Sequence, residues 1–240
     1  ARLARSASAT ATLDGVIVSP DLPEEYGFLL EDGPQPRLRA LNRARMEQIC
    51  ATIAAVSPAG RPLLLKNPWD YAGNFRLVKS LFPAAKFIFL LRDPLAVVNS
   101  QLRAVREMLG EPNPYAALLA PWYARLLERP RLRRALHALY AGPTGLRITR
   151  RHVARAAAYH IANIGALPAD DVFTLRYEDL CAAPQRWVER MVRFSRTTAA
   201  RCAGDEPLIA PRRAELLPEV QRNAARIRGQ LRAYCAWYGY

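Results

Sequence analysis

Arg92 and Ser100 are the two side chains in this sequence whose types and spacing best suit the binding of an anion. Arg92 follows the apolar run 86–91 (KFIFLL), and Asp93-Pro94 then turns the chain into a segment with helical spacing. Ser100 lies eight residues after Arg92. Eight residues are about two helical turns, so Ser100 lies on the same side of the helix as the first residues of that helix. An Arg offers a planar fork to a phosphate, and a Ser adds one hydroxyl donor. The spacing leaves a second interpretation open, in which Arg92 pairs with Asp93 and Ser100 is a surface serine.

Lys66 is a second cation at the end of an apolar run. Residues 62–66 (PLLLK) are too few for a helix and lie between breakers, so they predict a strand that ends at the turn Asn67-Pro68. Ligands bind at the carboxyl ends of parallel strands, so Lys66 and Arg92 are both candidates for one crevice. Lys occurs only three times among 35 basic residues, and its compact charge can follow a moving oxyanion. A solvated strand end is the alternative interpretation of Lys66.

The elements that must position these residues alternate between strands and helices. Such alternation predicts an α/β fold with a parallel sheet, covered on both faces where a strand is apolar throughout. Residues 1–36 and 197–211 have turn-rich or irregular patterns. The predicted strands are 62–66, 86–91 and 172–177, and the predicted helices are 37–56, 74–81, 94–109, most of 115–167 with breaks at Pro121, Pro130 and Gly142-Pro143, 184–194 and 218–237.

The composition is that of a basic domain with a sizeable core. Of the 240 residues 51% are hydrophobic, and Lys+Arg exceed Asp+Glu by 35 − 21 = 14. No apolar run approaches the ~18 residues that a membrane span needs. The four Cys form no Cys-x-x-Cys pair, which weakens zinc and disulfide interpretations and favours a reducing, cytoplasmic location. We expect most of the excess charge to be solvated Arg-rich helix surface, with the remainder favouring an anionic partner.

Three blocks of the sequence resemble one known family. Residues 63–100 (LLLKNPWDYAGNFRLVKSLFPAAKFIFLLRDPLAVVNS) resemble the central block of sulfotransferases that use 3′-phosphoadenosine 5′-phosphosulfate, and are closest to the bacterial and tyrosylprotein-type branch. Residues 175–184 (LRYEDLCAAP) are similar to the family's Tyr-Glu-Asp-Leu…Pro motif, and 235–240 (CAWYGY) to its usual ending. The resemblance covers roughly residues 20–240. It implies a single domain over 1–240, with a loop-rich start (1–36), a core with the 3′-phosphate site (37–109), a helical acceptor side (110–170) and a final strand and helices (171–240).

The resemblance also implies roles for four residues. By match to the family motifs, Arg92 and Ser100 bind the 3′-phosphate of the donor, and Tyr177 contacts its adenine end. Lys66 matches the lysine that lies at the sulfuryl group and the bridging oxygen. The implied co-substrate is 3′-phosphoadenosine 5′-phosphosulfate, with no metal. The implied fold is a parallel sheet of P-loop-nucleotide type flanked by helices.

The sequence departs from the family in the loop that holds the 5′-phosphosulfate. Nothing matches Gly-x-x-Arg-Ser-Gly-[Thr/Ser]-[Thr/Ser]. Gly142-Pro143-Thr144-Gly145 is not a substitute, because it follows the other motifs and lies between helical segments without a strand before it. With Ala1 as first residue, we expect that the chain lacks the N-terminal part of the domain and that these 240 residues alone transfer no sulfuryl group. A degenerate, non-catalytic relative is the alternative.

The catalytic base is not assigned by the sequence. Glu24 and Glu25 are the nearest candidates, although a solvated acidic loop is the favoured interpretation of both. His137, His152 and His160 lie in Arg- and Ala-rich helices and are expected to be surface or core residues. Glu178 and Asp179 match a family motif and are expected to be structural.

The function expected from the sequence is transfer of a sulfuryl group from the phosphosulfate donor to a hydroxyl or amine acceptor whose identity no motif specifies. The alternative is a non-catalytic basic nucleotide- or RNA-binding module. That alternative predicts aromatic residues interleaved with the basic ones on one face. Here the Tyr and Trp residues are dispersed. We therefore expect no nucleic-acid partner and no membrane span.

Overall fold

Two parallel strands, β1 (Phe87–Leu91) and β2 (Val172–Arg176), form the sheet in the described part of this computed structural model, which comprises residues 26–30, 37–57, 62–67, 70, 73–196 and 215–240. Their register runs from Phe87↔Val172 to Leu91↔Arg176. Both strands were predicted from apolar runs between breakers. The parallel pairing is confirmed, and the chain has an α/β fold that is mostly helical.

Burial of β1 is one-sided rather than two-sided. Phe87, Phe89 and Leu91 are buried on one face, whereas Leu90 on the other exposes 51% of its surface. The expectation that both faces of this strand are covered is therefore wrong for the Leu90 side.

The predicted strand at 62–66 is also wrong. Residues 62–67 have no strand pairing, and Leu64 exposes 88% of its surface. An apolar run becomes a strand only where a neighbour accepts its hydrogen bonds. Between described residues, the Tyr26 N–H donates to the Lys66 carbonyl at 3.3 Å, and no ladder of strand hydrogen bonds forms.

The helices of the region 115–167 begin at the breaks predicted from its prolines. Pro121, Pro130 and Pro143 each occupy the first turn of a helix, where the missing N–H costs nothing. The predicted helix 218–237 is instead three short helices, interrupted at Asn223 and Leu231. The helices are α1 (Arg43–Val56), α3 (Phe75–Leu81), α4 (Pro94–Gly110), α5 (Pro114–Leu119), α6 (Pro121–Leu127), α7 (Pro130–Ala141), α8 (Pro143–Asn163), α9 (Tyr177–Ala182), α10 (Pro184–Ser195), α11 (Pro218–Arg222), α12 (Ala224–Gln230) and α13 (Arg232–Tyr238), with short 3-10 turns at Tyr26–Leu29, Ala40–Asn42, Ile164–Ala166 and Ala169–Asp171.

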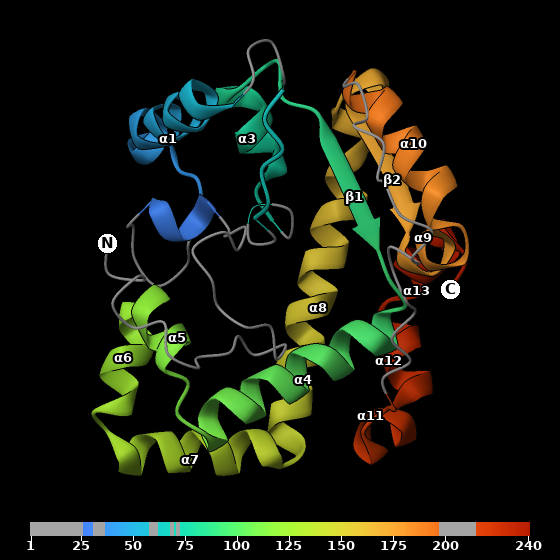
Figure 1. The fold of residues 1–240 in the computed structure, drawn as a ribbon. Helices are drawn as coiled ribbons and strands as arrows, with labels where there is room; N and C mark the ends of the chain where they lie inside the picture. Colours follow the sequence, from blue (N-terminus) through green and yellow to red (C-terminus); the bar gives the residue numbers. More distant parts are fainter. Residues whose placement is uncertain (1–25, 31–36, 58–61, 68–69, 71–72, 197–214) are drawn as a thin grey trace.

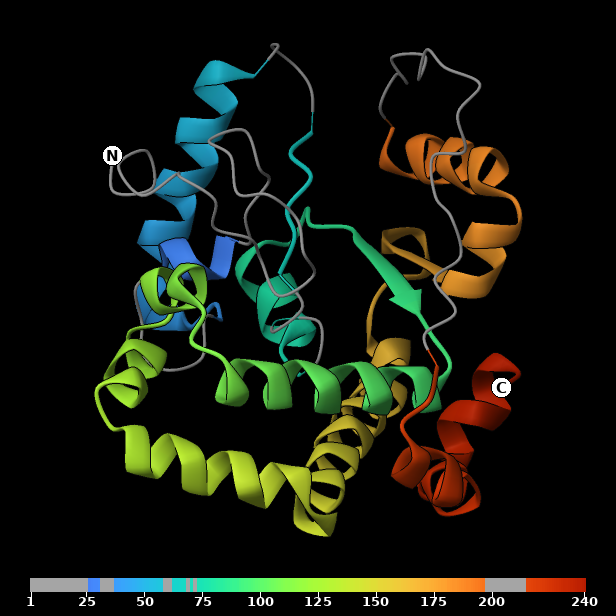
Figure 2. The same cartoon turned by 60° about the horizontal axis from the view of Figure 1, so that its bottom comes forward.

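In the orientation of Figure 1, the long helices pack against the sheet and extend below it. In Figure 1, α8 runs down the middle, α4 crosses the lower part, and α9 and α10 lie beside β2. Figure 2 shows α7 running alongside α4 in the opposite direction before α8 returns toward the strands. The chain thus leaves β1 through α4 and comes back to β2 through α8, which is the crossover that parallel strands require.

The buried face of β1 packs on aromatic side chains. Phe75 of α3 meets Phe89 edge to face with ring centroids 5.2 Å apart, and His160 near the end of α8 meets Phe89 at 4.8 Å. These contacts fix α3 and α8 against the strand whose carboxyl end carries Arg92.

The corner between α7 and α8 depends on Gly145. A Cβ at this position would lie 2.4 Å from the backbone oxygen of Tyr140. The two helices can therefore meet this closely only with glycine there. In the Gly142-Pro143-Thr144-Gly145 segment, Gly142 separates α7 from α8 and the other three residues begin α8, so no strand precedes the segment, as predicted. No helix among the described residues is both long and apolar enough to cross a membrane.

Candidate active site

Arg92 is the first residue after β1, and the Tyr234 hydroxyl holds its backbone on both sides. The Arg92 N–H donates to the Tyr234 oxygen at 3.3 Å, and the Tyr234 hydroxyl donates to the Arg92 carbonyl at 3.2 Å. Burial raises the pKa of Tyr234 to about 12, so this hydroxyl keeps its proton at neutral pH. The strand end is therefore fixed by a neutral tyrosine from α13.

The guanidinium of Arg92 lies over the ring of Tyr177, 4.5 Å from the ring centroid. The sheet register explains this contact. Leu91 and Arg176 are partners across the two strands, so the next residue of each strand leaves the same edge of the sheet side by side. Two of the four predicted site residues are thus brought together, and both are only partly buried.

The alternative in which Arg92 pairs with Asp93 is not what the structure contains. The Asp93 carboxylate caps α4 by accepting the Leu95 N–H at 2.8 Å, and its other oxygen lies 3.7 Å from Arg228 of α12. A side chain that accepts an orphan N–H at a helix start stabilises the helix by about 1 kcal/mol. Asp93 therefore positions α4 and leaves the Arg92 guanidinium to Tyr177.

Ser100 lies on α4, whose helical start after Arg92 is confirmed. Its neighbours Val98 and Asn99 are buried, whereas Ser100 is exposed. Within the described residues its hydroxyl makes no hydrogen bond. Arg92 and Ser100 thus belong to one strand–helix unit, Arg92 partly buried and Ser100 exposed, and no hydrogen bond between described residues joins them.

Glu178 joins the two strand ends, as its expected structural role requires. One carboxylate oxygen accepts the Asp93 N–H at 3.1 Å, and the other accepts the Tyr240 hydroxyl at 2.8 Å. Burial acts to raise the pKa of Glu178, but hydrogen bonds from its own backbone N–H, from Asp93 and from Tyr240 outweigh it and leave the pKa below the ordinary value. Glu178 is therefore an ionised link rather than a candidate base.

Residues 239–240 complete this arrangement. Gly239 has φ 72°, a conformation that favours glycine, and its carbonyl accepts a hydrogen bond from Arg176 at 3.3 Å. The turn places the Tyr240 ring parallel to that of Tyr234 at 5.9 Å and beneath the Arg176 guanidinium at 4.5 Å. Sequence patterns did not predict the contacts of Arg176 with Gly239 and Tyr240, because these residues are more than 60 positions apart in the chain.

Lys66 lies in the segment 62–67 before α3, which is not part of the sheet, and its side chain is exposed. Its backbone is nevertheless held on both sides. The Tyr26 N–H donates to its carbonyl at 3.3 Å, and the next residue, Asn67, is fully buried and donates from its side chain to Asp70 at 3.1 Å. The lysine therefore follows a fixed backbone although it ends no strand.

Asp70 is the centre of that support, and sequence reasoning did not identify it. Its carboxylate is fully buried and accepts the Tyr26 hydroxyl, the Leu38 N–H at 3.0 Å and the Asn74 side-chain amide at 2.6 Å. A buried polar group is tolerated when such bonds satisfy it. An Asp four residues after the turn lysine was the available signal, but its partners come from the distant residues 26 and 38.

The sequence model of the Sulfotransferase family matches residues 10–199, which is most of the chain and includes Lys66, Arg92, Ser100 and Tyr177. The chain belongs to the Sulfotransferase family. No curated protein matches this sulfotransferase-family chain.

Two solved structures are similar to this sulfotransferase-family chain at low sequence identity. A sulfotransferase domain from the curacin biosynthetic pathway is 18% identical, with TM-score 0.43 over 80% of this chain and 72% of that one. A sulfotransferase from Alicyclobacillus acidocaldarius is 14% identical, with TM-score 0.45 over 90% of this chain and 86% of that one.

The three histidines of this sulfotransferase-family chain do not line the strand ends. His160 is buried and lies 2.6 Å from the Tyr238 hydroxyl, and burial lowers its pKa to about 4. His137 is partly buried on α7, and His152 is exposed on α8. The expectation of core or surface roles is confirmed for these positions. Glu24 and Glu25 lie outside the described residues.

Proposed function

We propose that this chain supplies donor-binding and charge-stabilising residues for transfer of a sulfuryl group from 3′-phosphoadenosine 5′-phosphosulfate to a hydroxyl or amine of an acceptor. The observation that carries the proposal is the Arg92 guanidinium over the Tyr177 ring at the carboxyl ends of β1 and β2. Family membership supports the reaction class. Carboxyl ends of parallel strands are where ligands bind in α/β sheets.

In this proposal Arg92 and Ser100 hold the 3′-phosphate. Arg92 offers two parallel N–H donors, and the exposed Ser100 hydroxyl adds a third. The face of the Tyr177 ring that contacts Arg92 keeps the guanidinium oriented. The remaining surface of the ring contacts the adenine end of the donor. These residues orient the donor, and orientation alone supplies a large part of a transfer reaction's barrier reduction.

Lys66 acts at the reacting end. The donor supplies a sulfuryl group on a good leaving phosphate, and negative charge builds on the bridging oxygen as that bond breaks. An ammonium at the end of a fixed backbone stabilises this charge more in the transition state than in the ground state. The backbone bond from Tyr26 and the buried Asn67–Asp70 contact supply the fixation. The sequence contains no match to the family's 5′-phosphosulfate loop, so the proposal concerns the residues at the 3′-phosphate and at the bridging oxygen.

Calorimetry with 3′-phosphoadenosine 5′-phosphate tests the proposal. Arg92→Ala should weaken binding by about 1.5–3 kcal/mol, because a charge-assisted bond is lost. Arg232→Ala is the matched control, since it removes one exposed arginine from α13. Unchanged affinity in Arg92→Ala, or tighter binding of a single-stranded oligonucleotide than of the bisphosphate, would contradict the proposal.

A further inference from the structure

A cavity of about 300 Å³ lies where the first turns of α8 face α12, away from the strand ends. Three arginines line it: Arg147 and Arg150 from α8, and Arg226 from α12. Its floor is apolar and includes Leu146 and Pro143. The volume is at the lower end of the range for small-molecule sites.

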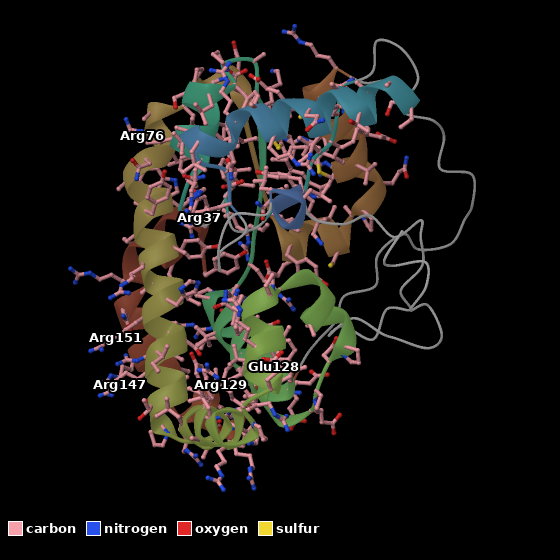
Figure 3. All side chains as sticks on the ribbon, turned by 90° about the vertical axis from the view of Figure 1, so that its left-hand side faces the viewer. Arg37, Arg76, Glu128, Arg129, Arg147 and Arg151 are labelled. Atoms are coloured by element: carbon pink, nitrogen blue, oxygen red, sulfur yellow. The ribbon has the colours of Figure 1, made fainter. Side chains whose placement is uncertain are left out.

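No acidic side chain among the described residues balances the charge in this cavity. No acidic side chain lines it, and Arg147 and Arg226 make no ion pair with any described residue. Arg150 donates to the neutral Gln230 at 3.1 Å. Figure 3 shows Arg147 and Arg151 projecting from the same side of α8, which adds a further positive charge nearby. Burial, followed by repulsion from Arg226, Arg151 and Arg147, lowers the pKa of Arg150.

An adjoining cavity of about 280 Å³ shares Pro143, Leu146 and the backbone turn at Asn223. It contains Glu219, but that carboxylate is held by Arg106 of α4 at 2.5 Å. Glu219 is thus paired with Arg106, and no other acidic side chain among the described residues lines either cavity.

This cavity is separate from the donor site. Arg228 of α12 approaches Asp93 beside the strand ends, whereas Arg226 lines the cavity. Two residues on a helix differ by about 200° in direction, so these side chains leave nearly opposite faces of α12. The cavity also lies at the start of α8, where the helix dipole adds to the attraction of an anion.

We propose that Arg147, Arg150 and Arg226 form a binding site for a small organic phosphate or sulfate ester. The oxyanion lies between the guanidinium groups, which bind such groups with paired N–H donors. The carbon skeleton of the ester lies on Leu146 and Pro143. The Thr144 hydroxyl and the Asn223 amide also line the cavity and supply orientation. This site is independent of the proposed sulfuryl transfer.

The test measures calorimetric binding of phenyl phosphate, phenyl sulfate and inorganic phosphate at low salt. It uses the full chain carrying Arg92→Ala, so that the donor site does not contribute. We expect an aromatic ester to bind more tightly than inorganic phosphate, because only the ester covers the apolar floor. The tighter of the two esters identifies the oxyanion.

The double variant Arg147→Gln/Arg226→Gln should weaken ester binding at least tenfold. The matched control is Arg131→Gln/Arg134→Gln, which removes the same charge from exposed positions of α7 and should change affinity less than twofold. Equal losses in both double variants would mean general charge attraction and would overturn the proposal. Absence of ester binding at millimolar concentration would also overturn it.

Discussion

Tyr240 donates a hydrogen bond from its hydroxyl to Glu178 at 2.8 Å, and the same carboxylate accepts the backbone N–H of Asp93. The ring of Tyr240 stacks on Tyr234, whose hydroxyl holds the backbone of Arg92. The segment after α13 therefore reaches the strand end that carries the anion-binding arginine. Tyr240 is in this sense a positioning residue for Arg92.

Tyr240→Phe is expected to weaken binding of 3′-phosphoadenosine 5′-phosphate by about 0.5–1.5 kcal/mol, the usual worth of one hydrogen bond. Tyr238→Phe is the control, because it removes a neighbouring hydroxyl that contacts His160 instead. Calorimetry gives the affinity. Hydrogen exchange at the Asp93 amide should quicken in Tyr240→Phe and not in Tyr238→Phe. Equal behaviour of the two variants would show that Glu178 does not transmit the contact.

In a form of the protein that also carries the family's 5′-phosphosulfate loop, Lys66→Ala is expected to lower kcat on the order of 10²–10³-fold and to change bisphosphate affinity little. The leaving oxygen carries most charge in the transition state, so the lost interaction is differential. Steady-state rates and calorimetry separate the two quantities. A rise in KM with unchanged kcat would assign Lys66 to ground-state binding only.

Asp70→Asn is expected to cost about 1.5–3 kcal/mol of unfolding free energy. The amide places an N–H₂ group among the Tyr26, Leu38 and Asn74 donors that now share a carboxylate. Asp170→Asn, at an exposed aspartate, is the control and should lie within about 0.5 kcal/mol of the parent. Urea unfolding measures both. A cost for Asp70→Asn no larger than the control's would mean that this cluster does not stabilise the fold.

The free energy of unfolding is expected to fall in mild acid because of His160. Burial lowers its folded pKa to about 4, while the unfolded value is about 6.5. The unfolded state therefore binds the proton first, and unfolding becomes easier as pH falls from about 6.5 to about 4. Urea midpoints at pH 7.5, 6 and 5 should fall in the parent. His160→Gln should fall less over the same interval, and parallel slopes would contradict the assignment.

Sequence patterns predicted the parts of the fold that local chemistry determines. The apolar runs at 87–91 and 172–176 and the prolines that begin α6, α7 and α8 identify their elements without tertiary information. The strand predicted at 62–66 was wrong, because a strand forms only beside a partner strand, and the run of residues does not specify that partner. The prediction that the Leu90 face of the strand is covered was wrong for a similar reason, because coverage of a strand face depends on which elements pack against it.

The candidate site was likewise predictable only in part. Arg92 was predicted from its strand end and Tyr177 from the family resemblance, and the register brings the Arg92 guanidinium to 4.5 Å from the Tyr177 ring centroid. The supports of the site were not predictable, because Asp70 gathers donors from residues 26, 38 and 74, and Glu178 gathers them from 93 and 240. Long-range polar contacts leave no periodicity in the sequence.

The pairing of β1 with β2 has a consequence for synthesis of the chain. Phe87 pairs with Val172, so 172 − 87 = 85 residues must be made before the register can begin. At translation rates of 5–20 residues per second, β1 waits roughly 4–17 s for this partner. An apolar strand with an unpaired edge is a template for association with other chains. The α4, α7 and α8 helices are made during that interval, so their early collapse onto β1 would shorten its exposure on the ribosome.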